Sequence, residues 1–147
     1  MRKVFKTSQP WINSEEKKNI NLALKEKAIS GFYGKFIDKF EKEFSKYCGA
    51  KYGVSTSSGT TALHLAVKTL GIGVGDEVIV TTFTNMASIF SIFYSGARPI
   101  PVDIDKKTFN INPSLIEKKI TRKTKAIMIV HIFGHPVDFS RIQKIAK

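Results

Sequence analysis

From Lys51 onward, short β-branched runs alternate with longer stretches of helical periodicity. We expect strands over 77–82, 98–103 and 126–130, and a short one at Val54–Thr56, since these runs suit a pleated surface. Helical patterns follow the runs over 77–82 and 98–103. Two more start near residues 60 and 138. Such alternation predicts a three-layer α/β fold, with a mostly parallel sheet and helices on both faces. Pro99 and Pro101 each lack an N–H donor, so the strand over 98–103 belongs at an edge or is irregular.

The first 50 residues are predicted to form two helices and no strand. One covers about 14–29, and Asn13 with Glu16 has the spacing of a capping box at its start. The second is strongly amphipathic, and its apolar stripe consists of Phe36, Ile37, Phe40, Phe44 and Tyr47. A stripe at this spacing indicates core or interface. We therefore divide the chain into a helical segment, 1–50, and an α/β domain, 51–147.

Composition excludes several classes of protein. The net charge of +12 raises the question of nucleic-acid binding, but the lysines alternate with apolar residues on predicted helices, as solvated faces do. Arginine is scarce and no nucleic-acid docking motif is recognisable, so we expect no nucleic-acid partner. Cys48 is the only cysteine, which excludes an internal disulfide and fits the cytoplasm. No apolar run approaches the roughly 20 residues of a membrane span, and no secretory signal is present.

The segment 51–70, KYGVSTSSGTTALHLAVKTL, predicts a strand, a polar turn and a helix. The turn is Ser57, Ser58 and Gly59. The first N–H groups of a helix are unpaired and carry partial positive charge, and a glycine without Cβ lets an anion approach them. Together with the hydroxyls of Ser58 and Thr60, this turn suits a phosphate. The alternative is that Ser57 or Ser58 simply caps the helix.

The wider sequence resembles the DegT/DnrJ/EryC1/StrS family of pyridoxal-phosphate-dependent sugar aminotransferases. The resemblance lies in the order of GFYGKFIDKFEKEFSKYCGAKYGV, SSGTTALHLAVKTLGIGVGDEVIVTTFTNMASIF, GARPIPVDID and FNINPSLIEKKITRKTKAIMIVHIFGHPVDF. It covers nearly all of the chain from about residue 31. It implies part of the large domain of a fold-type I pyridoxal-phosphate enzyme.

The resemblance also implies site residues. The coenzyme phosphate would be bound by Ser58, Gly59 and Thr60. Many family members carry an aromatic residue against the coenzyme ring where this chain has Asn85, so Asn85 is the candidate there, with Phe83 as a nearby alternative.

The GFYG segment, residues 31–34, matches a part of the family that lies near the substrate. Phe32 and Tyr33 are therefore candidate substrate-binding residues. The alternative is that both rings pack inward from a glycine-flanked loop.

The reaction implied by the resemblance moves an amino group, usually from glutamate, onto a keto carbon of a nucleotide-linked sugar. Family members work as homodimers. In the family, the Schiff-base lysine and the aspartate beside the pyridinium nitrogen lie after a segment like residues 131–147, so the resemblance implies that both follow Lys147. The helical pattern also runs to Lys147 without a stop signal. We expect an N-terminal part of a longer protein, inactive and poorly soluble by itself. A subset of the family has histidine in place of the lysine and acts as a dehydratase.

Three competing interpretations are weaker. The glycines of GIGVGDE, residues 71–77, follow a helix and precede a strand, which predicts a turn and not a dinucleotide loop. Asp103 and Asp105 have the D-I-D spacing that holds a divalent ion in glycosyltransferases, or they end a strand in a simple turn. The chain could also be a non-catalytic remnant that binds a partner subunit through apolar helices.

The histidines do not predict a metal site. His64 is expected on a helix face. His131 and His135 are four residues apart, but Gly134 and Pro136 exclude the regular helix that would bring them together. His131 follows the strand over 126–130, so a polar role at the edge of the coenzyme site is its functional alternative.

Overall fold

The computed structural model describes residues 8–30 and 34–147. Its contacts divide the chain into two compact units, 1–55 and 56–147, which are described separately. The boundary after residue 50 that the sequence suggests stays a prediction. None of the helices in the described ranges is long and apolar enough to span a membrane.

Unit 1 contains two helices, α1 (Ser14–Lys25) and α2 (Phe36–Tyr47). The predicted capping box is confirmed, since the Asn13 N–H donates to Glu16 Oε2 at 2.7 Å and the Asn13 side chain accepts in return. Helix α1 ends four residues before the predicted limit of 29, because Lys27 turns to a left-handed φ of 55°. After α2 the chain returns against it, and a Cβ added at Gly53 would lie 2.6 Å from the Glu41 carbonyl oxygen.

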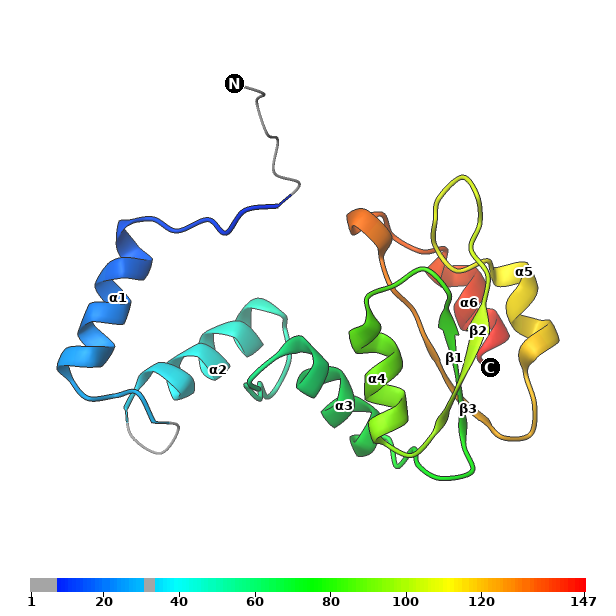
Figure 1. The fold of residues 1–147 in the computed structure, drawn as a ribbon, viewed down its shortest axis with the longest axis horizontal. Coiled ribbons are helices and arrows are strands. Elements are labelled where there is room, and N and C mark those ends of the chain that lie inside the picture. The colour runs from blue at the N-terminus through cyan, green and yellow to red at the C-terminus, as the bar shows by residue number, and fades with distance from the viewer. Residues whose placement is uncertain (1–7, 31–33) are drawn as a thin grey trace, which may run out of the picture. The chain divides into compact units, whose positions relative to one another are not determined.

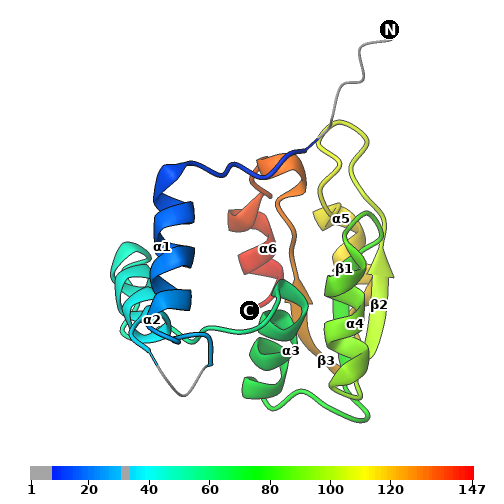
Figure 2. The same ribbon diagram turned by 60° about the vertical axis from the view of Figure 1, so that its left-hand side comes forward.

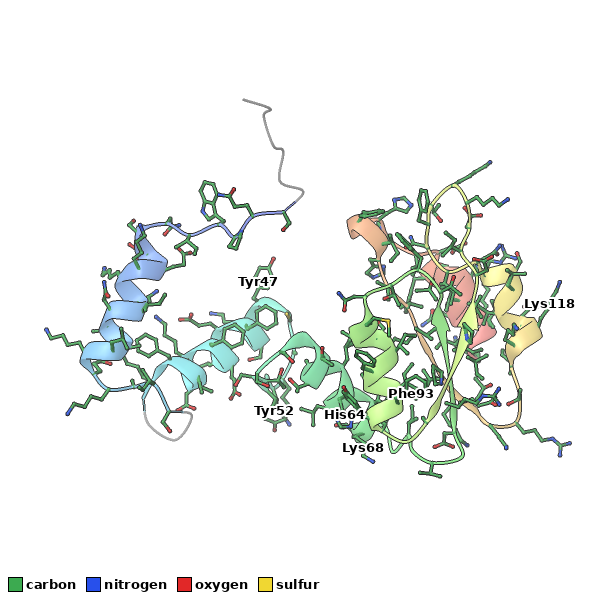
Figure 3. All side chains as sticks on the ribbon, in the orientation of Figure 1. Tyr47, Tyr52, His64, Lys68, Phe93 and Lys118 are labelled. Atoms are coloured by element: carbon green, nitrogen blue, oxygen red, sulfur yellow. The ribbon has the colours of Figure 1, made fainter. Side chains whose placement is uncertain are left out.

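The aromatic stripe of α2 is exposed. No residue of α1 or α2 is buried, so the prediction of a core position is wrong for unit 1 and the interface interpretation remains. The rings of Phe40 and Phe44 stack with centroids 5.4 Å apart while each residue stays about half exposed. Tyr47 is 86% exposed (Figure 3).

Unit 2 is built on three parallel strands, β1 (Glu77–Thr81), β2 (Arg98–Val102) and β3 (Thr124–Met128). Their order is β2-β1-β3, which puts the proline-bearing β2 at one side of the sheet, as predicted. The strand expected at residues 54–56 is not present. Val54 is 72% exposed there, and the Ser55 N–H donates to a Glu41 carboxylate oxygen instead of to another strand.

Helices cover both faces of the sheet, and the predicted three-layer α/β arrangement is confirmed (Figure 1). One outer layer consists of α3 (Gly59–Thr69) and α4 (Met86–Tyr94). Figure 2 shows α4 lying over the sheet. The other outer layer consists of α5 (Pro113–Ile116), which continues as the 3₁₀ turn η1 (Glu117–Lys119), and α6 (Phe139–Ile145).

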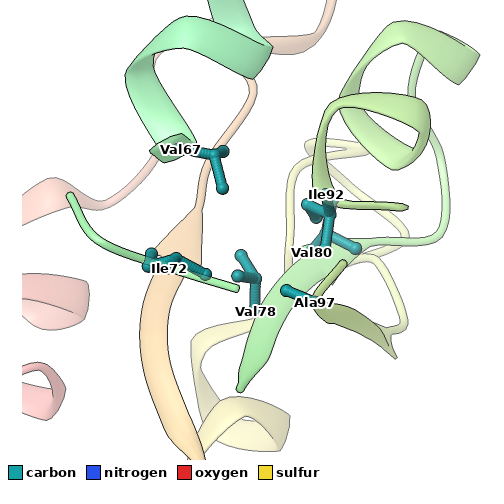
Figure 4. Close-up of a cluster of buried hydrophobic side chains, with 6 residues drawn as sticks. All are labelled: Val67, Ile72, Val78, Val80, Ile92 and Ala97. Carbon is teal, nitrogen blue, oxygen red and sulfur yellow. The ribbon is translucent and has the colours of Figure 1, made fainter. Parts of the chain in front are cut away.

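The central strand explains the layering, because its alternate side chains enter two separate cores. Val78 and Val80 pack with α3 and α4 in the cluster of Figure 4, together with Val67, Ile72, Ile92 and Ala97. Ile79 points to the opposite face and packs with residues of α5 and α6. All five residues of β1 are buried.

The predicted helix boundaries depend on caps that the structure contains. Gly71 and Gly96, which follow α3 and α4, take left-handed φ values of 72° and 84°. Asn112 caps α5 with Pro113 in the first turn, and Asp138 caps α6. The GIGVGDE segment forms the predicted turn between α3 and β1. The sequence pattern predicted that the last helix runs to Lys147. In the structure, helix α6 ends earlier, at Ile145.

Candidate functional site

The start of α3 is fixed by a reciprocal pair of hydrogen bonds. Ser58 is the N-cap, and its Oγ accepts from the Thr61 N–H at 3.2 Å. The Ser58 N–H in turn donates to Thr61 Oγ1 at 3.0 Å. The capping interpretation is therefore confirmed for Ser58. The two hydrogen bonds between Ser58 and Thr61 hold the first turn of α3 in one conformation. They do not use the N–H groups of the two residues that lie between Ser58 and Thr61.

Those two residues, Gly59 and Thr60, carry the donors that a ligand can use. Within residues 56–147, no acceptor is present for the N–H group of either residue or for the Thr60 hydroxyl. A Cβ added to Gly59 would meet no atom within 4 Å, so the space above its backbone is open. Free amides, the positive end of the helix and open space make a site that can take a dianion such as a phosphate.

Asn85 begins the neighbouring helix. It is the N-cap of α4, where its Oδ1 accepts from the Ala87 N–H at 2.9 Å. Because α4 follows β1 directly and α3 leads into β1, the N-termini of both helices lie toward the carboxyl end of that strand (Figure 1). Ligands of open parallel sheets bind at this end. Phe83, in the loop between β1 and Asn85, is 44% exposed.

Two candidates fall outside these contacts. Phe32 and Tyr33 lie outside the described residues, so their assignment to the substrate stays a prediction. A cavity of about 550 Å³ in unit 2 is lined by loop and helix residues from 105–114 and 135–141 and by none from α3 or α4.

Asp103 and Asp105 take part in turn bonds. Asp103 Oδ1 accepts from the Ile104 N–H at 2.8 Å. Asp105 Oδ1 accepts from the N–H groups of Lys107 and Thr108, and these bonds lower the pKa of Asp105. Among the described residues no cluster of three potential ligands could hold a metal ion. Both carboxylates thus accept hydrogen bonds within the turn that follows β2.

The histidines occupy different environments. His64 is on α3 (Figure 3). Its ring lies edge-on to that of Tyr94, with centroids 5.9 Å apart. Its Nε2 is buried and has no hydrogen-bond partner in the described structure. His131 and His135 flank the 3₁₀ turn η2 (Ile132–Gly134), so the prediction that they do not share a regular helix is confirmed.

One polar residue near the strand ends was not recognised from the sequence. Asn110 is only 3% exposed, and its side chain bonds to three backbone groups of the segment 131–137. An asparagine in a predicted loop gives no signal of such long-range bonds, since its partners are more than 20 positions away. Phe109 and Phe133 have left-handed φ values of 59° and 53°, which their residue type does not predict.

With this geometry in hand, comparison with known proteins identifies the family. Residues 10–147 match the DegT/DnrJ/EryC1/StrS aminotransferase family. The chain therefore belongs to that family. It is 48% identical to the GDP-perosamine synthase of Escherichia coli O157:H7 over 139 residues, which are 95% of this chain and 38% of that protein.

Two further likenesses add detail. The chain is 46% identical to the dTDP-3-amino-3,6-dideoxy-alpha-D-galactopyranose transaminase of Aneurinibacillus thermoaerophilus, over 92% of this chain and 38% of the relative. The fold matches that of the E. coli GDP-4-keto-6-deoxy-D-mannose-3-dehydratase with bound hydrated PLP, with a TM-score of 0.83 and 33% identity over 94% of this chain and 36% of the other. The chain thus spans little more than a third of the length of these proteins.

Proposed function

We propose that the protein to which this chain belongs is a pyridoxal-phosphate-dependent aminotransferase that acts on a nucleotide-linked keto sugar, with glutamate as the amino donor. The observation that carries the proposal is the pair of amides at Gly59 and Thr60, which have no acceptor in the described part of the chain and lie beside open space at the start of α3. Family membership and the names of the similar sugar-modifying enzymes support it.

The residues present fit the phosphate of the coenzyme. The N–H groups of Gly59 and Thr60 and the Thr60 hydroxyl would donate to its oxygens, and the positive end of α3 would offset its charge. Ser58 would contribute mainly by holding the turn, since its Oγ already accepts a hydrogen bond from the Thr61 N–H. Asn85 would lie beside the coenzyme ring, with its Nδ2 still able to donate. When bound, the coenzyme supplies an electron sink for the transfer of the amino group.

Gly59→Val tests this site in the full-length protein. The added methyl groups would occupy the open space above the helix start, so we expect the affinity for pyridoxal phosphate to fall by at least tenfold in an absorbance titration of the apo form. Ala66→Val, at an exposed position later in α3, is the matched control and should bind as the wild type does. Normal binding by the Gly59 variant would refute the proposed site.

We further propose that the lysine and the aspartate needed for turnover lie outside these 147 residues. No lysine of the chain occurs in a motif that matches the catalytic lysine of the family. The 147-residue chain assayed alone should therefore show no amino transfer, whereas the full-length protein should be active. Measurable turnover by the short chain would contradict this proposal.

We also propose a cytoplasmic homodimer. Support comes from apolar side chains that remain exposed on the outer helices of both units, including Phe40 and Phe44 on α2 and Phe90 and Phe93 on α4. Exposed apolar surface of this kind marks association sites. Sedimentation of the full-length protein would test the proposal, and a monomer at micromolar concentration would overturn it.

A dehydratase is the second candidate, because one of the similar structures is a keto-sugar dehydratase that contains PLP. The two activities differ in their sugar product, since the aminotransferase adds nitrogen and the dehydratase removes a hydroxyl group. Mass spectrometry of the product formed from a nucleotide-linked keto sugar and glutamate distinguishes them.

A further inference from the structure

The loop after β3 is held by one buried side chain. Asn110 Oδ1 accepts from the Ile132 N–H at 3.0 Å, and its Nδ2 donates to the carbonyl oxygens of His135 at 3.0 Å and Pro136 at 3.2 Å. The amide thus joins the loop after β2 to both ends of the segment 131–137. Three hydrogen bonds from a residue that is only 3% exposed fix this loop in one arrangement.

The same place carries backbone strain. Three non-glycine residues of the described chain have positive φ values, and two of them, Phe109 and Phe133, are next to Asn110 and to its partner Ile132. The ring of Phe83 is near both of theirs, with centroids 6.1 Å from Phe109 and 6.0 Å from Phe133. The loops after all three strands therefore meet through these rings at the carboxyl end of the sheet. Strained residues that persist in such a cluster point to a functional constraint.

His131 is fixed within this loop by its own hydrogen bond. The Val137 N–H donates to His131 Nδ1 at 3.2 Å. Because an accepting nitrogen must carry a lone pair, the ring hydrogen is on Nε2. Nε2 has no acceptor among the described residues, and the side chain is exposed. His131 therefore offers one oriented N–H donor just beyond β3, which pairs with β1 in parallel.

We propose that His131 Nε2–H donates a hydrogen bond to an oxygen atom of the ligand bound at this end of the sheet, and that Asn110 is a positioning residue that acts through His131. The inference rests on the proposed function, since the ligand is either the coenzyme or the sugar nucleotide. Asn110 holds the 132–136 backbone, this backbone sets Val137, and the Val137 N–H sets the imidazole.

A double-mutant cycle on the full-length protein tests the proposal. His131→Ala removes the donor and leaves the bonds of Asn110 intact. Asn110→Asp keeps an acceptor for Ile132 but sets a carboxylate oxygen against the carbonyls of His135 and Pro136. Asn112→Asp is the matched control, because an aspartate there still caps α5 by accepting from Ser114. Circular dichroism at 10 °C confirms that each variant is folded before ligands are compared.

Two affinities are measured: the dissociation constant of pyridoxal phosphate for the apo form, and the KM for the nucleotide-linked keto sugar. We expect His131→Ala and Asn110→Asp each to weaken one of them by about tenfold, the loss of one hydrogen bond. The double variant should be no weaker than His131→Ala alone, since Asn110 acts through that ring. The constant that changes shows whether the coenzyme or the sugar is the acceptor.

Several results would overturn the inference. If His131→Ala leaves both constants unchanged, the imidazole does not touch the ligand, and this conclusion holds even if Asn110→Asp fails to fold. If the two substitutions have additive effects, Asn110 does not act through His131. Failure of the wild-type protein to bind pyridoxal phosphate would refute the proposed function itself, and the inference with it.

Discussion

At the scale of single residues, the structure shows which residues at the start of α3 cap the helix and which offer donors to a ligand. The sequence alone does not distinguish these two roles. Ser58 forms the cap, whereas the N–H groups of Gly59 and Thr60 have no acceptor among the described residues. Both tasks favour small hydroxyl residues and glycine, so the sequence SSGTT supports either. Only the hydrogen bonds of Ser58 with Thr61 show which residue serves which purpose.

The cap should have a measurable effect on stability. Ser58→Ala removes the acceptor for the Thr61 N–H, and we expect a loss of about 1 kcal/mol in the free energy of unfolding. Urea denaturation followed by circular dichroism measures it. Ser57→Ala is the control, because its Oγ has only a long contact of 3.4 Å to Thr61 Oγ1. Equal effects of the two substitutions would contradict the assignment of the cap.

Glu41 should make unit 1 sensitive to acid. The Ser55 N–H and then the Ser55 hydroxyl donate to its carboxylate and lower its pKa below 4.5. Since the pKa is lower in the folded than in the unfolded state, this stabilisation is complete above pH 4.5 and is lost as the pH falls through the folded value.

Glu41→Gln should therefore flatten the acid limb of a plot of stability against pH, measured by α2 helicity between pH 5 and about 2. Glu43→Gln, whose carboxylate has only an exposed ion pair with Lys39 at 3.8 Å, is the control and should leave the limb unchanged. An identical acid limb for the Glu41 variant and the wild type would show that the Ser55 bonds do not contribute.

At the scale of elements, helices were predictable because their ends carry local chemical signals. Each signal lies within a few residues of the helix end that it sets. The examples are the capping box of Asn13 at the start of α1, Pro113 after Asn112 at the start of α5, and Gly96 after the end of α4. The strand expected at 54–56 failed for the opposite reason. A strand needs a neighbour to accept its hydrogen bonds, and Glu41 takes the Ser55 N–H instead.

The candidate site was predictable to a similar extent. The glycine-bearing turn before α3 could be recognised because its amides and its helix lie together in the sequence. Asn110 and its contacts with the segment 131–137 could not, since they depend on how the loops after β2 and β3 meet in space. Likewise nothing in the residue type of Phe133 predicts a left-handed backbone.

The central strand offers a direct test of the layered core. Ile79 is 0% exposed, so Ile79→Ala should cost about 2–5 kcal/mol in the free energy of unfolding, as buried large-to-small changes do. Val74→Ala, at a position that is 92% exposed, should change it by less than about 0.5 kcal/mol. Denaturant titrations of both variants measure the difference, and a small effect at Ile79 would contradict the assigned core.

At the scale of the whole molecule, charge and apolar surface act in opposite directions. The net charge of +12 favours solubility, yet many large apolar side chains are more than 40% exposed on α1, α2 and α4. Composition predicts the charge, but it does not show which apolar residues find partners inside the described chain. We therefore expect the 147-residue chain alone to associate.

Substitution on α2 tests this expectation. Phe40→Glu combined with Phe44→Glu removes two half-exposed rings, so the chain should shift toward a monomer in size-exclusion chromatography with little loss of stability. Lys42→Glu with Lys46→Glu changes the charge of the same helix but keeps its apolar face, and it should still associate. A wild-type chain that elutes as a stable monomer would contradict the prediction.

The position of β1 between two strands that follow it in the sequence has a consequence for biosynthesis. Strand β1 (residues 77–81) is translated before both strands that pair with it, β2 and β3. Strand β3 is not complete until residue 128 has been added. Until then a strand whose five residues are all buried in the folded protein has an open flank that another nascent chain can join. Chaperone dependence of this protein should accordingly be set by the delay between the first strand and the third.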